Sequence, residues 1–575
     1  MMIGSGRRID YDLVVIGAGL GGLTAAAYLA ALGRNVLMLE KYRVLGGSSH
    51  VFRRRGQWEF EVGVHYIEDC GPGGMIPTVL AGLGLSGSVD FRQLDQNGFD
   101  TTIGPDLELR TPVGWDTYRD NLIDAFPRER KAIGRYLKLA QPTVSAADRM
   151  HPDFGSARRI AQAGTAAPVF MLPYAAVLGM CGFSARAIIA LSVQAGAYAS
   201  TPDRSPFGMH TGYIGTGIER GAWFPLGGGQ TLSAVLYAHA RNHGAMVRTD
   251  STVDQIVVKA GHVQGVRLAD GEMIQAPVVI SNADIKRTFL ELVGSRDLPM
   301  RSVVRARTWS MSLPFINTYF GLNRDLRNAV NTNYYVIPSW DRVPNKRSLP
   351  GFVSSLLYRA GPAVRDQWLD DYSANMPAFI HSGTIRDPNN PRTAPMGCSS
   401  VEAMTLVPGN RRLWGITSCP QDHSYRDSGI YQDIKSRLTD AMLDRVSIAF
   451  PGARSDVLWS EAATPATQER YVGNTDGAPF GLAVTPTQYG PMRPGVATPI
   501  HGLLCVGTSN RWGPGTTGAM ISGVHAAGAV IGRDLMQQVR AGVVHGDAAK
   551  VPMKGQSWDP LAACKPSRQA AVGNR

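Results

Sequence analysis

The sequence is poor in cysteine, and its few cysteines form no recognisable pair or cluster. Six cysteines occur in 575 residues, and none of them is part of a C-x-x-C motif. None is spaced with histidine in the way that a zinc site requires. We therefore expect no metal site, and the cysteine usage favours a reducing, cytoplasmic compartment.

Long apolar runs are also missing. The most apolar window, AAPVFMLPYAAVLGMCGF at 166–183, is interrupted by Pro173 and contains two glycines. Proline removes a backbone donor and kinks or breaks a helix, so the window does not predict a membrane-spanning helix. We expect it to be a buried or interfacial segment.

Charge is sparse and is not concentrated in one place. Charged residues make up 18% of the chain, and 58 Lys and Arg against 46 Asp and Glu give a net charge of +12. The basic residues occur in scattered pairs and triplets, such as Arg53 to Arg55, which is typical of a solvated surface. We therefore expect no nucleic-acid partner, and the length predicts more than one domain.

What the sequence does contain begins with YDLVVIGAGLGGLTAAAYLAALGRNVLMLEK at 11–41. This stretch predicts a buried strand at 13–16, a glycine turn, an Ala-rich helix and a second strand at 36–39. Gly17 permits the tight turn, Gly19 lets the backbone approach a pyrophosphate, and Gly22 lets helix and strand pack closely. Glu40 closes the second strand, where a carboxylate binds ribose hydroxyls and disfavours a 2′-phosphate. The unit therefore predicts a dinucleotide site that does not take NADP.

A glycine pair follows, in EKYRVLGGSSH at 40–50. Gly46 and Gly47 let the backbone pass flat against a cofactor, and Ser48 adds a hydroxyl donor. This arrangement of an acid and a later G-G pair resembles the FAD-dependent oxidoreductases of the phytoene desaturase and amine oxidase superfamily. The resemblance implies FAD as the cofactor.

A second nucleotide-domain block spans 221–283. It predicts a glycine-rich loop, a helix, a hairpin turning at Ala260-Gly261, and a buried strand at 278–281. The block resembles the part of the same superfamily in which a strand residue, here Val253, flanks the adenine. The resemblance implies an α/β fold with a discontinuous Rossmann-type FAD-binding domain at 10–77, 216–299 and 495–538.

The inserts between these pieces predict an α+β substrate domain of sheet plus helices, at 78–215 and 300–494. The first insert is mainly helical in pattern. The second contains expected strands at 313–323, 399–408 and 411–420 and an expected helix at 431–450. Residues 541–575 are small, polar and aperiodic, which predicts a disordered tail.

A second glycine fingerprint, GPGTTG, lies at 513–518. The strand before it ends at Gly507, no strand follows its helix, and no acid closes a ribose site. We therefore expect a helix N-terminus that contributes to the first cofactor site. In the superfamily the last strand and helix contact the flavin, which assigns Gly507, Gly518, Ala519 and Met520 to it. The motifs and the resemblance together give these candidate FAD-binding residues: Gly17, Gly19, Leu20, Gly22, Glu40, Lys41, Gly46, Gly47, Ser48, Val253, Gly507, Gly518, Ala519 and Met520.

Within the superfamily, WEFEVGVHYIE at 58–68 and TPATQERYVGNTDGAPFGL at 464–482 resemble the phytoene desaturase, carotenoid isomerase and retinol saturase group. The resemblance implies an apolar polyene or isoprenoid substrate, and contact with a membrane surface through the 166–183 window beside Arg158, Arg159 and Arg186. A packed core segment is an equal alternative for that window. His65 is the candidate catalytic residue, as proton donor, orienter or flavin neighbour, and a structural histidine is the alternative.

Three functions stay open from the sequence. The first is desaturation or saturation of carbon–carbon bonds in a polyene by an FAD-dependent oxidoreductase. The second is redox-neutral, flavin-dependent cis–trans isomerisation of the same substrates. The third is a flavin-containing lipid-binding or scaffold protein without catalysis.

Overall fold

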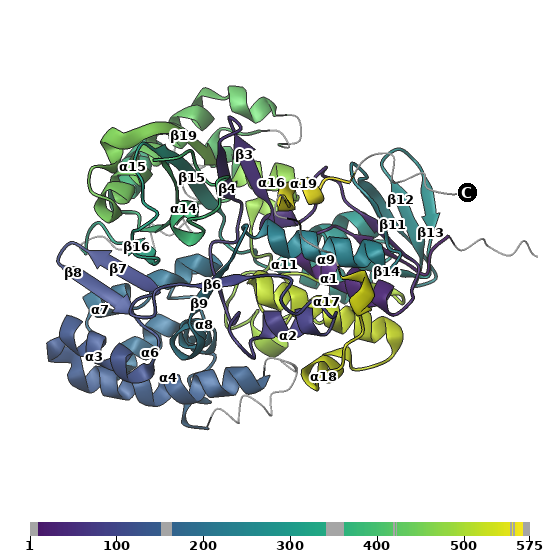
Figure 1. The fold of residues 1–575 in the computed structure, drawn as a ribbon, viewed down its shortest axis with the longest axis horizontal. Coiled ribbons are helices and arrows are strands. Elements are labelled where there is room, and N and C mark those ends of the chain that lie inside the picture. The colour runs from purple at the N-terminus through teal and green to yellow at the C-terminus, as the bar shows by residue number, and fades with distance from the viewer. Residues whose placement is uncertain are drawn as a thin grey trace, which may run out of the picture.

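The computed structural model describes residues 10–150, 164–340, 362–417, 420, 423–551, 555 and 558–566. A parallel sheet with its helices occupies one side of the molecule, and a larger mixed sheet with a helical layer occupies the other (Figure 1). No described helix is both long and apolar enough to cross a membrane.

The parallel sheet is built from segments at both ends of the chain and from its middle. All residues of the first two strands are buried, as expected for strands covered by helices on both faces. Every neighbouring pair in this sheet is parallel. In spatial order the strands are β10 (Met246–Arg248), β2 (Val36–Leu39), β1 (Leu13–Ile16), β14 (Val278–Ser281) and β20 (Leu503–Cys505). Strands β1, β2 and β14 have the bounds that the sequence predicts.

Three helices pack around this sheet: α1 (Leu20–Ala31), α9 (Gln230–Asn242) and α17 (Gly515–Ile531). Helix α1 packs against both of the others. Its contact with α17 is very close at Gly523, where an added Cβ would lie 2.5 Å from the carbonyl oxygen of Gly21 and 2.8 Å from the Cβ of Thr24. Only glycine allows the two backbones to approach so closely.

The second large sheet is mixed. All neighbouring pairs are antiparallel except β16 and β7, which are parallel. In spatial order its strands are β19 (Val457–Ala463), β15 (Phe315–Leu322), β18 (Ser399–Leu406), β17 (Ala378–His381), β16 (Asn333–Val336), β7 (Asp100–Gly104) and β8 (Leu107–Thr111). Helix α15 (Gly429–Ala449) packs on one face, against Ile316, Ile380 and Ala403. Because side chains alternate along a strand, Phe315, Phe379 and Met404 lie on the opposite face.

The first insert folds into a helical layer below this sheet (Figure 1). Its helices are α3 (Trp115–Ala125), α4 (Arg130–Met150), α6 (Tyr174–Cys181), α7 (Ala185–Ala190) and α8 (Phe207–Arg220). The apolar window of the sequence forms α6 and its flanks, where Phe170, Tyr174 and Val177 are buried. Within it Leu172 and Met180 are exposed, the latter at 67%.

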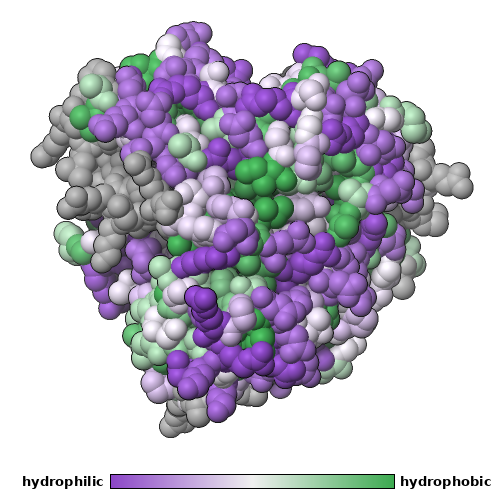
Figure 2. All heavy atoms as spheres, turned by 90° about the vertical axis from the view of Figure 1, so that its left-hand side faces the viewer, coloured by the Kyte–Doolittle hydropathy of each residue, from purple (hydrophilic) through white to green (hydrophobic). Residues whose placement is uncertain are grey.

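The basic residues expected beside this window are only partly described. Arg158 and Arg159 lie outside the described residues, and Arg186 forms an ion pair with Asp106 at 3.0 Å. Figure 2 shows the face formed by this side of the molecule, where a central strip of apolar residues is bordered by hydrophilic ones. Membrane contact of this region stays a prediction.

Smaller elements connect the two sides. The remaining strands are β3 (Val51–Arg54), β4 (Trp58–Glu61), β5 (Ile67–Glu68), β6 (Phe91–Gln93), β9 (Ala222–Pro225), β11 (Val253–Lys259), β12 (His262–Leu268) and β13 (Met273–Gln275). The remaining α-helices are α2 (Met75–Ala81), α10 (Ile285–Arg287), α11 (Met300–Thr308), α13 (Pro362–Asn375), α14 (Gly383–Arg386), α16 (Pro465–Val472), α18 (Leu535–Arg540) and α19 (Pro560–Ala563). Strands β11 and β12 form the expected hairpin around Ala260 and Gly261, both of which have positive φ.

Two segments differ from what the sequence predicts. The strand expected at 411–420 begins instead with a 3-10 helix, Arg411–Trp414, because the Trp414 indole is buried and donates to the Pro408 carbonyl at 2.9 Å. In the expected disordered tail, residues 558–566 pack on α9, with Leu561 and Cys564 buried. The Cys564 carbonyl accepts a hydrogen bond from the Leu45 N–H at 3.0 Å, a long-range contact with no local sequence signal.

The close α1–α17 contact predicts that Gly523→Ala destabilises the protein. Overpacking a tight contact costs about 1–3 kcal/mol, so the midpoint of urea unfolding should fall. Gly134→Ala is the matched control, because Gly134 lies exposed in α4 with no atom within 4 Å of an added Cβ. That variant should gain roughly 0.5–1 kcal/mol from helix propensity. An unchanged midpoint for Gly523→Ala would contradict the close packing.

Candidate functional site

One large cavity connects the parallel sheet with the mixed sheet. Its volume is about 470 Å³, which lies in the range of small-molecule and cofactor sites. One end is formed by the glycine turn after β1 and by Glu40, and the other by Phe315, Phe379 and Met404. The cavity therefore joins a nucleotide-type loop to an apolar wall.

Most of the predicted cofactor residues line this cavity. The lining includes Gly17, Gly19, Leu20, Glu40, Lys41, Gly46, Gly47, Ser48, Val253, Gly507, Gly518 and Ala519. Gly22 and Met520 lie behind it. An added Cβ at Gly22 would lie 2.2 Å from the Gly17 carbonyl oxygen, which explains the need for glycine there, and Met520 is fully buried in the core.

Glu40 is a buried carboxylate that shapes the turn. Its Oε2 accepts a hydrogen bond from the Ala18 N–H and its Oε1 from the Tyr42 N–H, both at 2.8 Å. Burial raises the pKa of Glu40, and these two hydrogen bonds oppose that rise. The next residue, Lys41, donates to the Arg470 carbonyl at 3.1 Å, and burial lowers the pKa of its amine. This pair thus links the turn to the C-terminal turn of α16.

The two N-terminal glycine motifs touch one another. The Gly46 N–H donates to the Ala18 carbonyl at 2.8 Å, and an added Cβ at Gly47 would lie 3.2 Å from the Gly19 Cα. Gly46 and Gly47 both have positive φ, at 126° and 55°. The positive φ favours glycine at both positions, and the short contact with Gly19 leaves no space for a side chain at Gly47.

The C-terminal helix completes this end of the cavity. The N-terminal turn of α17, including Thr516, Thr517 and Gly518, lines it, and free amides at a helix N-terminus favour anions. The Gly507 N–H donates to the Ser522 Oγ at 2.8 Å, which fixes the loop before the helix. The fingerprint at 513–518 therefore borders the same cavity as the first fingerprint.

The sequence analysis missed Asn282. It follows β14 at the carboxyl edge of the parallel sheet, and its amide lies where Cβ atoms added to Gly19, Gly21 or Gly507 would fall, within 2.7–2.8 Å. Its side-chain Nδ2 donates to the Gly17 carbonyl at 3.4 Å. A polar residue directly after a buried parallel strand is the signal that could have identified it.

The middle of the cavity carries hydroxyl groups. The Tyr66 hydroxyl contacts that of Tyr213 and lies 2.9 Å from that of Tyr335. Nearby Glu68 also lines the cavity, and desolvation raises its pKa to about 8, with Asp100 and Asp69 adding to the rise and a hydrogen bond with Tyr213 opposing it. Near neutral pH this carboxyl is therefore uncharged.

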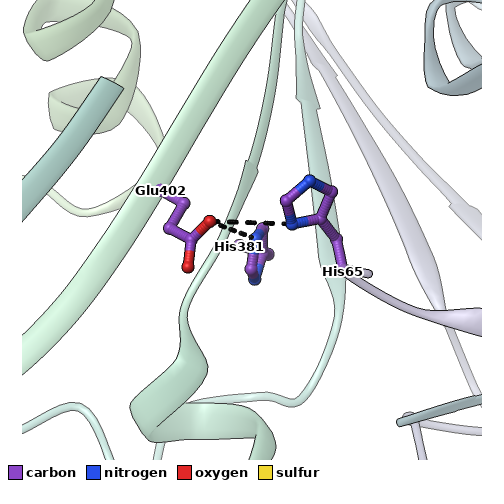
Figure 3. A group of neighbouring side chains, drawn as sticks. All are labelled: His65, His381 and Glu402. Atoms are coloured by element: carbon purple, nitrogen blue, oxygen red, sulfur yellow. Dashed lines mark ion pairs between the residues drawn. The ribbon is translucent and has the colours of Figure 1, made fainter. Parts of the chain in front are cut away.

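His65 lines the cavity and faces two further buried polar residues (Figure 3). His381 on β17 and Glu402 on β18 are directly opposite one another in the strand register, on the same sheet face as Phe379 and Met404. The His65 Nδ1 lies 3.6 Å from the Glu402 Oε2, and the His381 Nε2 lies 3.4 Å from the same oxygen.

Burial sets the protonation of this group. Desolvation lowers the pKa of His65 to about 3 and that of His381 well below its usual value, and it raises the pKa of Glu402 to about 7. His65 is therefore a neutral imidazole. His381 and Glu402 were not found from the sequence, although a histidine and a glutamate within otherwise apolar strands are a usable signal.

The amino-acid sequence is similar to one family model and to proteins of known function. Residues 15–83 match the family model for an NAD(P)-binding Rossmann-like domain. The human all-trans-retinol 13,14-reductase is 26% identical, with 92% of this chain and 87% of that protein covered. The chloroplastic prolycopene isomerase of Daucus carota is also 26% identical, with 91% of this chain and 80% of that protein covered.

Among solved structures, a putrescine oxidase double mutant aligns with a TM-score of 0.59 at 14% identity, covering 91% of this chain and 100% of that chain. Cyclohexylamine oxidase from Brevibacterium oxydans aligns with a TM-score of 0.56 at 17% identity, covering 92% and 99%. These likenesses confirm the α/β fold and the resemblance seen in the motifs. The chain is thus a homologue of the retinol 13,14-reductases and prolycopene isomerases, and it has the fold of these amine oxidases.

Proposed function

We propose that the protein is an FAD-dependent oxidoreductase that acts on carbon–carbon bonds of a long apolar polyene, such as a carotenoid or retinoid. The observation that carries this proposal is the continuity of the cavity, from the glycine turn and Glu40 to Phe315, Phe379 and Met404. The names of the relatives, which denote action on a retinoid and a carotenoid, support the substrate class.

The residues at the turn fit FAD. Glycines occupy the positions where a Cβ would obstruct the loop, a carboxylate stands at the end of β2, and free amides of α17 face the same space. We propose that the twelve predicted residues lining the cavity hold FAD, that Gly22 and Met520 pack behind them, and that Asn282 positions the loops. We also propose the predicted domain division, with 10–77, 216–299 and 495–538 as the FAD-binding domain and 78–215 and 300–494 as the substrate domain. Bound FAD supplies hydride transfer.

The chain's own residues exclude water and orient the substrate. Phe315, Phe379 and Phe480 give the substrate end an apolar wall, which favours an apolar ligand. His65 is neutral and has its Nδ1 turned towards Glu402, so we propose that it orients the substrate or contacts the flavin, in preference to the role of proton donor. A neutral Glu68 keeps negative charge away from the apolar part of the cavity.

Redox-neutral isomerisation is the second candidate, supported by prolycopene isomerases as similar to this chain as the reductases are. One experiment distinguishes the oxidoreductase from the isomerase. Photoreduced protein is mixed with all-trans-retinol or a cis-carotenoid under anaerobic conditions. For an oxidoreductase that saturates its substrate, flavin absorbance returns and the lipid gains two hydrogens by mass spectrometry. Isomerisation changes the double-bond geometry of the lipid without flavin reoxidation and without a gain in mass. If the protein shows no flavin spectrum after reconstitution with FAD, both candidate functions are refuted.

Glu40→Ala should weaken FAD retention. Hydrogen bonds to a charged group contribute about 1.5–3 kcal/mol, so the dissociation constant should rise roughly 10-fold to 100-fold. Fluorescence titration measures it, at temperatures where circular dichroism shows both proteins folded, because Glu40 also holds Ala18 and Tyr42. Glu108→Ala, at an exposed ion pair with Arg110, is the control with unchanged affinity. Equal affinity in both variants would remove Glu40 from the ribose site.

Glu68 should make polyene binding depend on pH. Below pH 8 the carboxyl is protonated and neutral, and above pH 8 it ionises and places a negative charge in the apolar cavity. Affinity for a retinoid should therefore fall between pH 7 and 9, by up to about tenfold if bound ligand keeps the carboxyl protonated over this range. Glu68→Gln mimics the neutral form, so its affinity should not change over this range in a fluorescence-quenching titration. The same fall in Glu68→Gln would exclude Glu68 as its cause.

A further inference from the structure

His65, His381 and Glu402 come from three separate segments, yet they offer one ligand atom each within 4.8 Å of one another (Figure 3). The His65 Nδ1, both ring nitrogens of His381 and the Glu402 Oε2 are buried and have no hydrogen-bond partner. Such atoms are costly to bury unless something else satisfies them. The cluster therefore lacks a component that the surrounding protein does not provide.

The spacing matches metal coordination better than hydrogen bonding. Zinc binds histidine nitrogen and carboxylate oxygen at about 2.0–2.2 Å, so ligand atoms in a tetrahedral site lie about 3.4 Å apart. The two distances to the Glu402 Oε2 are 3.4 and 3.6 Å, whereas an N–H···O bond is about 2.9 Å long. The ligand nitrogens of the two imidazoles lie within 4.8 Å of one another.

Buried charged groups of both signs surround the cluster: Glu61 lies beside Glu402, and the Arg386 guanidinium lowers the pKa of both histidines. Glu402 and Glu61 are both buried, and after desolvation the neighbouring Glu402 contributes to the raised pKa of Glu61. Within the described part of the chain, no lysine or arginine forms an ion pair with Glu402. The nearby buried cation, Arg386, donates instead to Asn331 and Asn333 and lies close to the buried Asp100. A divalent cation between the two histidines would favour the ionised form of Glu402 and so offset the desolvation that raises its pKa.

Neighbouring backbone groups fix the positions of Glu402 and His381. The Glu402 Oε1 accepts the Glu61 N–H at 2.9 Å, which orients the carboxylate and leaves Oε2 towards the histidines. His381 and Glu402 are cross-strand neighbours on a rigid sheet. His65 also borders the cavity, which places the cluster directly behind the cavity wall.

We propose that His65, His381 and Glu402 bind a divalent transition-metal cation, zinc being the best match to two imidazoles and one carboxylate. The site lies at the wall of the substrate end of the cavity. The proposal depends on these three side chains alone and does not require the proposed flavin chemistry.

Zinc binding to the full-length protein tests the proposal. Protein purified without chelator is dialysed against a chelator, then titrated with zinc chloride by calorimetry, and metal content is measured by elemental mass spectrometry. We expect one zinc ion per chain and a rise in thermal unfolding temperature on binding. Cobalt substitution should give an absorption spectrum typical of nitrogen and oxygen ligands in a low-symmetry site.

Matched variants locate the ion. His381→Gln and Glu402→Gln should each weaken zinc binding about 100-fold or more. Glu402→Gln is nearly isosteric and keeps a carbonyl that accepts the Glu61 N–H. It therefore tests the metal site even if His381→Gln fails to fold. His501→Gln is the control, because His501 and His262 lie side by side at the surface with ring centroids 4.7 Å apart and are a second place for adventitious zinc.

Three results would overturn the proposal: no zinc binding by the wild-type protein at micromolar concentrations, loss of binding in His501→Gln, or retention of binding in Glu402→Gln. In the first case the three side chains share a proton instead. Because every readout is metal content, affinity or stability, failure of this proposal leaves the proposed function standing, and the reverse also holds.

Discussion

The structure depends on backbone contacts that only glycine permits at the carboxyl edge of the parallel sheet. The turn after β1, the loop at Gly46 and Gly47, and the loop before α17 meet there around Asn282. A side chain at Gly19, Gly21, Gly22 or Gly507 would displace a neighbouring backbone or the Asn282 side chain. The dense packing of small residues thus brings both ends of the chain to one place and leaves an open cavity beside it.

This arrangement explains the second glycine fingerprint. GPGTTG satisfies a dinucleotide pattern in its letters, but β20 adds to the same sheet as β1, and α17 packs on α1. Its helix N-terminus therefore borders the cavity of the first fingerprint. The second fingerprint has no acid that could bind a ribose. We therefore interpret the two fingerprints as parts of one nucleotide site, built from both ends of the chain.

Desolvation governs the chemistry of the cavity. It raises the pKa of Glu68 and Glu402 and lowers that of His65 and His381, so each of these groups is driven towards its uncharged form. A cavity with neutral walls suits an apolar substrate. At the meeting point of the two histidines and Glu402, the unpartnered ring nitrogens and carboxylate oxygen are the atoms that the proposed cation would bind.

The sequence by itself determined the nucleotide-binding half. Strands β1, β2 and β14, the turn glycines, Glu40 and the hairpin at Ala260 follow from local patterns, because each is set by residues close together in the chain. Only the tertiary structure decided the rest. The pairing of β7 and β8 with the mixed sheet, the position of Cys564 beside Leu45, and the meeting of His65 with His381 and Glu402 all depend on contacts between distant segments. Such contacts arise from packing and burial between distant segments, so they cannot be predicted from the spacing of residues along the chain.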